Sequence, residues 1–573
     1  MLKRTVLFTI LLVTCFFLTA CQADFGLEEL KMQNLDGSDN NVNNLNYDIL
    51  DKGAVKGGTI KLFTTTPDTL NPVLTKSTYV SDFLSFVYEG LVKLDHSGLP
   101  IPVLSDSWSV SDDGLIWNFH IRSDVMWQDS QPLTAGDVEY TLDFILNTMA
   151  DSVYKRQLQN IATYAASDAS NFKMVLRKPN SFTPEMMTFP ILPRKDSTLV
   201  DLFDPANFRP VGTGPFKFDS YTEGKKVVLL ANDKWWKLKT ESGDGGDIMY
   251  LNEIDVNVYK NSDDAVNAFQ TGDIEAICIN TADFKKYNGR TDLIIKKFTS
   301  RDFEFLTMNL YNPVFADPNL RKAIASAIDK DALISDVYGG DAIAADLPVS
   351  PESWLFEGNA KVAAVGAVST GDLLKKGGWI EKKRELNENE SKYYKSINGI
   401  KKDLNVEILA NSNNSSRINA ANVICSQLKA AGINATLTTL SWDEMLARMD
   451  SKKFDMAILG CRTTQIPDIS FLYSNSYLQS YLALQGDAGR NVSGYGNAEV
   501  NSYIERIFAE HSDSNKKAMF FNMKQAIDAD MPYIGLYFTE NAVIYRKNVR
   551  GLLDPYVWDR YNDITRWYKP DLQ

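Results

Sequence analysis

The side chains that most often do chemistry are few in this chain, and their spacing forms no catalytic set. The 573 residues contain three histidines, His96, His120 and His511, and no two of them lie at metal-ligand spacing. Ser-x-x-Lys patterns occur, among them those that begin at Ser426 and Ser514, but neither of these two is followed by the Ser-Asp-Asn and Lys-Thr-Gly motifs of the enzymes that use such a pair. No Gly-x-Ser-x-Gly elbow and no glycine-rich phosphate loop occurs. The sequence therefore predicts no metal centre, no cofactor and no enzyme.

A cysteine near the start carries the clearest modification signal. Two cations precede an apolar run from Val6 to Leu18, which is typical of a secretory signal peptide and too short to span a bilayer comfortably. Residues 18–21, Leu-Thr-Ala-Cys, resemble the lipobox of bacterial lipoproteins, whose cysteine becomes the new N-terminus and carries diacylglycerol. We expect a signal peptide over 1–20 and a lipid anchor at Cys21. The alternative is an ordinary signal peptide with a chance cysteine.

The charge of the chain excludes some partners. The formal net charge is −13, and it becomes −15 when the two cations of the signal segment are removed. Nucleic acid and anionic lipid surfaces repel such a chain, so attachment to a membrane must come from the lipid on Cys21. Residues 21–52 are polar and rich in asparagine, which predicts a flexible tether. The later cysteines are too few for a disulfide framework, and we expect Cys278 and Cys425 to be buried.

Strand and helix patterns alternate through the rest of the chain. At this length more than one core is expected, and alternating strands and helices favour α/β lobes. The charged segment 382–402 is predicted to be an exposed excursion. The clearest elements are a strand at 59–63, a hairpin strand at 117–122, a helix from 134 to about 148, a strand at 405–409 and a helix at about 416–431 that ends before Gly432.

Several segments together resemble one family. The chain is similar to the extracytoplasmic solute-binding proteins of ABC importers, in the large oligopeptide and dipeptide class. The likeness runs from about Lys56 to Arg550. The segments that carry it, in the order of the family, are Tyr88–Val92, 117–122 with 125–129, 132–138, 212–217, 321–330 and the residues around Gly432 and Ile433.

The resemblance implies a fold. It is an α/β clamp of the periplasmic-binding-protein type, with two lobes joined by crossing strands and an extra sub-domain on lobe I. In such a clamp a ligand that contacts both lobes shifts the population toward the closed form. The implied parts are lobe I at 53–95, 205–300 and 540–573, the inserted sub-domain at 96–204, lobe II at 301–539, and hinge strands near 303–309 and 534–540.

The resemblance also implies which residues line the cleft. For Lys76, Ser77, Thr78 and Tyr79 the competing interpretation is an ordinary surface loop. For Phe305, Thr307 and Trp442 the alternative is a place in the core. The implied ligand-binding residues are Lys76, Ser77, Thr78, Tyr79, Phe305, Thr307, Ser416, Trp442, Gly460, Cys461, Arg462, Thr463, Thr464, Asp468 and Tyr495.

The strand-exit loop departs from the family pattern. In oligopeptide binders an acidic residue of this loop pairs with the α-amino group of the peptide, and here Thr463 or Thr464 stands at that position. An uncompensated ammonium group is costly to bury. Either Asp468 takes over the role, or the ligand has no free amino terminus. In the second case Arg462 could hold a carboxylate, a sulfate or a sugar hydroxyl.

The expected function is that of a capture subunit. We expect a monomeric, membrane-anchored, extracytoplasmic protein that binds peptides between its lobes and delivers them to the permease subunits of an ABC importer, without a cofactor. One alternative is the same fold binding another solute, such as an oligosaccharide or a metal chelate. A secreted hydrolase and a peptide-sensing or chaperone-like lipoprotein are further alternatives.

Overall fold

The computed structural model describes residues 54–147, 151–194, 208–238, 247–287, 289–356, 368–384, 387, 390–474 and 491–570. The predicted signal peptide, Cys21 and nearly all of the predicted tether lie outside these ranges. Within them, no helix combines the length and the hydropathy needed to cross a bilayer. The same residues contain no cluster of three or more His, Cys, Asp or Glu side chains placed to hold a metal ion.

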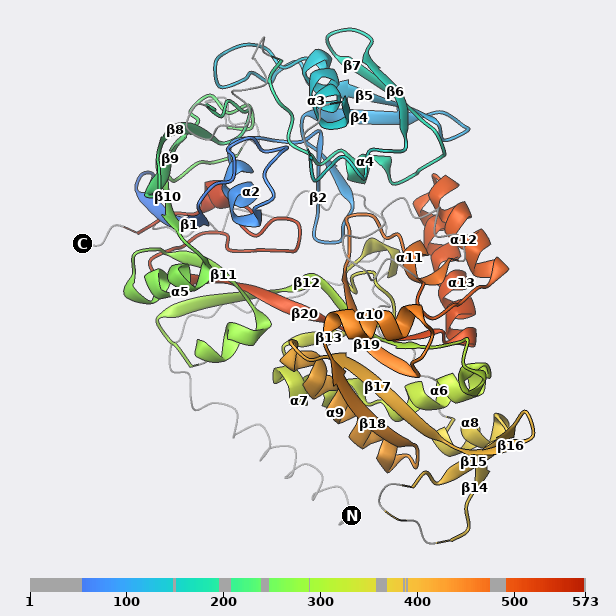
Figure 1. Cartoon of the computed structure of the whole chain (residues 1–573). Coiled ribbons are helices and arrows are strands. Elements are labelled where there is room, and N and C mark those ends of the chain that lie inside the picture. The colour runs from blue at the N-terminus through green and yellow to red at the C-terminus, as the bar shows by residue number, and fades with distance from the viewer. Residues whose placement is uncertain are drawn as a thin grey trace, which may run out of the picture. The chain divides into compact units, whose positions relative to one another are not determined.

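Two long antiparallel strands form the centre of the largest sheet (Figure 1). They are β12 (Leu293–Met308) and β20 (Tyr533–Arg546), and each overlaps one of the predicted hinge strands. The sheet has the order β11-β20-β12-β19-β17-β18, and β13 also pairs with β20. The other strands are β11 (Ala276–Asn280), β13 (Ala342–Ala344), β17 (Asn405–Asn411), β18 (Asn434–Leu440) and β19 (Met456–Arg462).

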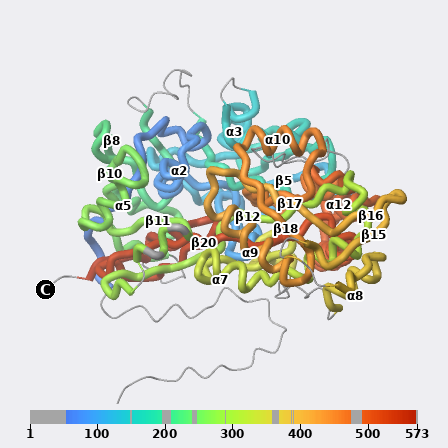
Figure 2. The backbone as a smooth tube through the Cα atoms, turned by 60° about the horizontal axis from the view of Figure 1, so that its bottom comes forward, coloured from blue at the N-terminus to red at the C-terminus, as the bar shows by residue number. Residues whose placement is uncertain are grey.

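Helices cover both faces of the β17–β18 part of this sheet (Figure 2). Ile408 of β17 packs into one core cluster with α9, whereas its neighbour Leu409 packs into another with α10. Successive strand residues point to opposite faces, so both faces of β17 are buried. The helices of this half are α6 (Pro318–Ala327), α7 (Lys330–Tyr338), α8 (Thr370–Lys376), α9 (Ser415–Ala430), α10 (Trp442–Asp450), α11 (Ser470–Tyr473), α12 (Ala498–Ala509) and α13 (Asp513–Asp530).

A second sheet contains the first predicted strand. Its order is β1-β10-β9-β8, in which β1 and β10 are parallel and the other pairs are antiparallel. Asn261 caps α5, and Ser77 caps α2 by accepting a hydrogen bond from the Val80 amide. The elements are β1 (Thr59–Thr65), β8 (Phe216–Thr222), β9 (Lys226–Ala231), β10 (Glu253–Tyr259), α2 (Thr78–Leu84) and α5 (Ser262–Thr271).

A third sheet, of order β4-β5-β7-β6, contains the predicted hairpin. Trp117, Phe119 and Ile121 of β5 are buried, as the alternating pattern predicts. The helix after it begins beside Thr134, whose amide donates to the Asp137 carboxylate at 2.8 Å. The strands of this sheet are β4 (Ser105–Val110), β5 (Ile116–Ile121), β6 (Ile161–Ala166) and β7 (Asn171–Leu176), and the helices of this part of the chain are α3 (Ala135–Asn147) and α4 (Thr183–Met186). β2 (Val92–Leu94) and β3 (Pro100–Pro102) form a separate two-stranded sheet.

Two of the segments that carry the family likeness pack directly on each other. The Gly214 amide donates to the Val87 carbonyl at 2.9 Å. A β-carbon on Gly212 would lie 1.8 Å from the Val87 oxygen, and one on Gly214 would lie 2.6 Å from the Phe86 oxygen. Because only glycine permits so close a backbone approach, the glycines of this motif serve the fold.

The charged segment 382–402 is not simply an excursion. It contributes to a small sheet of β14 (Ile380–Glu381), β15 (Tyr393–Ile397) and β16 (Ile400–Asp403). Tyr393 and Ser391 are buried, and Tyr393 packs into the core beside β17 and α9. The prediction missed these strands because their exposed positions are charged. Of the two cysteines expected to be buried, Cys425 is buried and Cys278 is only partly so.

Candidate functional site

A cavity of about 420 Å³ lies between segments that are far apart in the sequence. Much of its lining comes from α2, residues 88–94 and residues 556–565. Arg301 of β12 and Gln465 of the loop after β19 also line it. The volume falls within the range of roughly 300–1,000 Å³ that is usual for small-molecule sites. Arg301 and Gln465 belong to the part of the chain that the family resemblance implies is lobe II, and the other segments named here belong to the implied lobe I.

The charged groups of this lining are held by their neighbours. Glu89 accepts hydrogen bonds from the Trp236 indole and the Thr213 hydroxyl, each at 2.9 Å. Burial raises the pKa of Glu89, and these donors oppose the rise. Asp82 and Arg560 form an ion pair with an O–N distance of 3.0 Å. Burial raises the pKa of Asp82 to about 6, and Arg560 lowers it.

Arg301 reaches the cavity from a bulge in β12. Three residues of β12, 300–302, stand opposite the single residue Thr539 of β20. Such bulges redirect side chains and are common beside functional sites. The Arg301 Nε donates to the Thr463 carbonyl at 2.7 Å, and the guanidinium carbon lies 5.4 Å from the centroid of the Trp558 ring. The bulge and these two contacts therefore hold a cation at the edge of the cavity.

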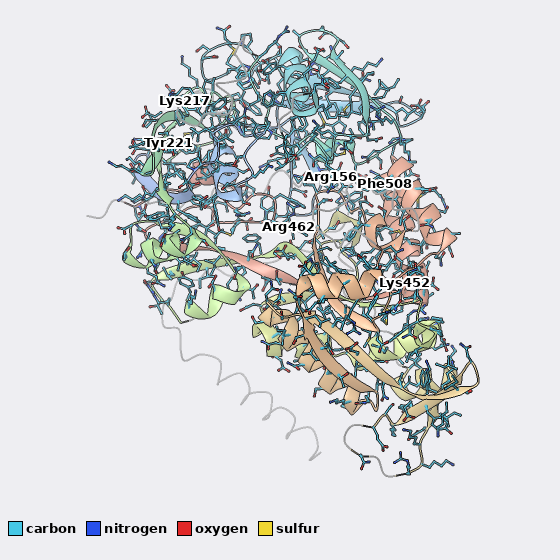
Figure 3. The ribbon with its side chains drawn as sticks, viewed as in Figure 1. Arg156, Lys217, Tyr221, Lys452, Arg462 and Phe508 are labelled. Atoms are coloured by element: carbon cyan, nitrogen blue, oxygen red, sulfur yellow. The ribbon has the colours of Figure 1, made fainter. Side chains whose placement is uncertain are left out.

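The strand-exit loop lies beside Arg301. The Thr463 amide donates to the Arg301 carbonyl at 2.8 Å, and the Thr464 hydroxyl donates to the Ile466 carbonyl at 2.8 Å. Arg462, the last residue of β19, is labelled near the middle of Figure 3, and its side chain is 57% exposed. Its Nε is 3.9 Å from the Asp302 carboxylate, which is too far for a hydrogen bond.

Asp468 lies at a different cavity. It lines a smaller space of about 210 Å³ together with Lys178, Ile504 and Phe508, and none of these residues lines the larger cavity. The Asp468 carboxylate is buried and accepts a hydrogen bond from the Ser470 amide at 2.8 Å. This placement gives no support to the expectation that Asp468 replaces the missing acidic residue of the loop.

Gly460 lies against a buried ion pair. The Arg417 guanidinium donates to both carboxylate oxygens of Glu304, at 2.8 and 2.9 Å, and so joins α9 to β12. A β-carbon on Gly460 would lie 2.3 Å from atoms of both side chains. Gly460 is therefore required for this close packing. The neighbouring Cys461 is buried, which raises its pKa and keeps the thiol protonated.

The four residues after β1 have different surroundings. Thr78 lines the larger cavity. Lys76 is exposed and pairs with Asp151 at 2.7 Å, while Ser77 caps α2. Tyr79 packs on Phe63, with ring centroids 4.8 Å apart. Of these four predicted residues, the structure brings only Thr78 to the cavity.

Three predicted ligand contacts lie in the core. Phe305 is fully buried, with its ring 5.8 Å from that of Phe303, and Thr307 is fully buried on the same strand. Tyr495 is buried and donates a hydrogen bond to Asp530 at 2.8 Å. The core interpretation, which the sequence left open for Phe305 and Thr307, describes their surroundings here. Any contact of these residues with a ligand would require a rearrangement.

The two predicted residues at helix starts are half-buried. Trp442 is the first residue of α10, packs partly against the core, and follows Ser441, which forms a capping box with Glu444. Ser416 lies in the first turn of α9. Neither lines the larger cavity, so their roles in binding stay predictions.

Of the residues that line this cavity, sequence reasoning had singled out only Thr78 as a ligand contact, and those it missed include Arg301, Trp558 and Arg560. The only available signal was the run Tyr556-Val557-Trp558-Asp559-Arg560, which mixes aromatic and charged residues near the C-terminal end. Arg301 gave no signal, because its position depends on the bulge in β12.

Comparison with known proteins identifies a family. The sequence pattern described as bacterial extracellular solute-binding proteins, family 5 Middle, matches residues 100–481. A curated relative, the oligopeptide-binding protein AppA of Bacillus subtilis, is 24% identical over 524 residues, which cover 88% of this chain and 90% of the relative.

Solved structures show the same fold. The ABC transporter substrate-binding protein CtaP of Listeria monocytogenes is 20% identical, with a TM-score of 0.68 over 90% of this chain and 100% of that one. AppA of Bacillus subtilis in complex with a nonapeptide is 22% identical, with a TM-score of 0.57 over 90% of this chain and 99% of that one. The predicted two-lobed α/β clamp is thereby confirmed. The relatives are solute-binding proteins, so the prediction that the chain is not an enzyme is also confirmed.

Proposed function

We propose that this chain, which belongs to family 5 of the bacterial extracellular solute-binding proteins, captures peptides and delivers them to the permease of an ABC importer. The observation that carries the proposal is the cavity lined by α2 and residues 556–565 together with Arg301 and Gln465. The relatives named for oligopeptides support the choice of peptide as the solute.

The mechanism requires motion about the two long strands. In this proposal lobe I comprises 53–95, 205–300 and 540–573, the inserted sub-domain 96–204, and lobe II 301–539. A peptide that contacts both lobes binds the closed arrangement more tightly than the open one, and so shifts the population toward closure. β12 and β20 pair at 293–299 with 540–546, within the proposed lobe I, and at 303–307 with 533–538, within the proposed lobe II, which supports a hinge at these strands.

The protein is attached to the membrane by lipid in this proposal. Diacylglycerol on Cys21 holds it outside the cytoplasm, residues 21–52 act as the tether, and the protein works as a monomer. Replacing Cys21 by Ser should release the protein into the medium of a Gram-positive host. Cys15→Ser, within the signal segment, is the matched control and should leave the protein with the membranes. Retention of the Cys21→Ser variant would contradict the anchor.

Peptide capture is tested by binding and recovery. The purified protein is incubated with a mixture of tetra- to nonapeptides, with maltotetraose, or with a nickel–histidine chelate, and thermal melting is followed. We expect the melting temperature to rise with the peptides, and mass spectrometry to recover the bound peptides unaltered. A rise only with the sugar or the chelate would contradict the peptide assignment, and cleaved peptide would contradict a pure binding function.

A further inference from the structure

Arg301 has unused hydrogen-bonding capacity in the cavity wall. Its Nε donates to the Thr463 carbonyl, but its two terminal nitrogens have no hydrogen-bond acceptor among the described residues. It also forms no ion pair with a carboxylate in the described part of the chain. A guanidinium group carries five N–H donors, and the two terminal nitrogens hold four of them. The cavity therefore contains a fixed cation whose donors are still available.

The guanidinium is oriented before any ligand arrives. The bulge at 300–302 sets the direction of the side chain, the Thr463 carbonyl holds Nε, and Trp558 packs on the guanidinium at 5.4 Å. A planar guanidinium held in this way binds the two oxygens of a carboxylate with little further loss of conformational freedom. A lysine at this position would offer a point charge without that paired geometry.

The charges that act on Arg301 itself include two more arginines, Arg462 and Arg560, and one carboxylate, that of Asp302. Of the five acidic residues that line the cavity, Asp82 pairs with Arg560 and Asp247 with Arg566, each at 3.0 Å, and Glu89 accepts hydrogen bonds from Trp236 and Thr213. The remaining two are Asp559 and Asp563. Burial lowers the pKa of Arg301 to about 10, and the nearby positive charges of Arg462 and Arg560 act in the same direction, with Asp302 opposing them. A ligand anion would offset both the cost of burying the Arg301 charge and the repulsion among these arginines.

We propose that Arg301 anchors a carboxylate group of the bound peptide, through paired hydrogen bonds from its terminal nitrogens. The inference rests on the proposed function, because it takes the ligand to be a peptide. It agrees with the loop sequence, in which Thr463 or Thr464 stands where the family resemblance implies an acidic residue that pairs with the peptide ammonium group. We therefore expect this site to select a negatively charged group. The carboxylate is either the C-terminal group or the side chain of Asp or Glu.

The test uses two pools of random heptapeptides with equal composition. One pool ends in a free carboxylate and the other in an amide, and half of the members of each pool contain one Asp or Glu. The protein is incubated with each pool, unbound peptide is removed, and the retained peptides are quantified by mass spectrometry. For wild type we expect peptides that bear a carboxylate to be enriched about ten- to hundredfold over uncharged amides.

The variants separate the role of Arg301 from general effects of charge. Arg301→Gln should abolish the enrichment, and Arg301→Lys should retain part of it. Arg506→Gln is the matched control, because Arg506 also packs on an aromatic ring, that of Tyr503 at 5.7 Å, but lies outside the cavity. It should leave the enrichment unchanged. Thermal melting shows that each variant is folded, and the Lys variant remains informative if the Gln variant does not fold.

The outcomes distinguish the role of Arg301 from the capture of peptides as such. Preference for the acid pool over the amide pool assigns the C-terminal carboxylate, and enrichment of Asp- or Glu-containing peptides in both pools assigns the side chain. If wild type and Arg301→Gln retain peptides with the same charge preference, the role of Arg301 is refuted while peptide capture stands. If wild type retains no peptide from either pool, the proposed function fails and this inference fails with it.

Discussion

The ion pair between Glu304 and Arg417 offers a direct test of the packing of α9 on β12. Both side chains are largely buried, 12% and 15% exposed, and two hydrogen bonds join them at 2.8 and 2.9 Å. Removing one partner leaves a buried charge without its counterion, which costs about 3–5 kcal/mol. We therefore expect Glu304→Gln to lower the free energy of unfolding by about this amount.

The two single variants should differ in their dependence on pH. In Arg417→Met the remaining carboxyl group can take up a proton, because burial already raises the pKa of Glu304 and only Arg417 opposes that rise strongly. A raised pKa in the folded state favours folding at low pH, so the loss in Arg417→Met should shrink as pH falls from 8 to 5.5. In Glu304→Gln the arginine cannot lose its charge, and the loss should be nearly constant over this range.

The assay is urea denaturation of wild type, the two single variants and the double variant Glu304→Leu/Arg417→Met. Unfolding midpoints are compared at pH 5.5 and 8, provided that the slope of the unfolding free energy against urea concentration is the same for all variants. The double variant should lose less stability than either single variant, because neither charge remains buried. Two results would refute the reasoning: a double variant whose loss equals the sum of the single losses, or single variants within about 0.5 kcal/mol of wild type, as is usual for surface changes.

Three further predictions concern other parts of the chain. Trp442→Ala should weaken peptide binding about tenfold in calorimetric titration if this tryptophan forms an aromatic wall, and unchanged affinity would remove it from the site. Burial raises the pKa of Glu185 from 4.5 to about 7, so the folded protein holds a proton that the unfolded chain releases between these values. The contribution of Glu185 to the free energy of unfolding should therefore fall by up to about 3 kcal/mol as pH rises through this window. Glu185→Gln should remove that part of the pH dependence. Identical pH profiles of wild type and Glu185→Gln would count against a raised pKa of Glu185. Gly212→Ala places a β-carbon 1.8 Å from the Val87 oxygen and should destabilise the protein by about 3 kcal/mol or more in urea denaturation. In the control Gly136→Ala the new β-carbon has no contact closer than 3.4 Å, so this change should be neutral or slightly stabilising. Equal effects of the two changes would contradict the packing argument.

Local patterns in the sequence predicted the elements that depend on local physics. The strand β17, the helix α9 and its end before Gly432, which has a φ of +86°, follow from hydrophobic periodicity and from the need for glycine in a left-handed position. The hairpin strand β5 follows from simple alternation. The two-lobed arrangement came from the family likeness, because alternating strands and helices are compatible with several α/β folds.

The candidate site was less predictable, because it depends on long-range packing. All residues of β12 from Phe303 to Met308 are buried, so alternation cannot tell which of Phe305 and Thr307 faces a cleft. Arg301 reaches the cavity only because of the bulge opposite Thr539. Trp558 and Arg560 join it from a segment more than 250 residues later in the chain. No local sequence pattern predicts these long-range contacts.

The central claim is that this protein holds an unmodified peptide between its two lobes. The most direct measurement is mass spectrometry of the small molecules released by denaturing the protein after gentle purification from the cells that produce it. The account predicts intact peptides in near-stoichiometric amount, with carboxylate-bearing members over-represented. Recovery of an oligosaccharide or a metal chelate in their place would contradict it.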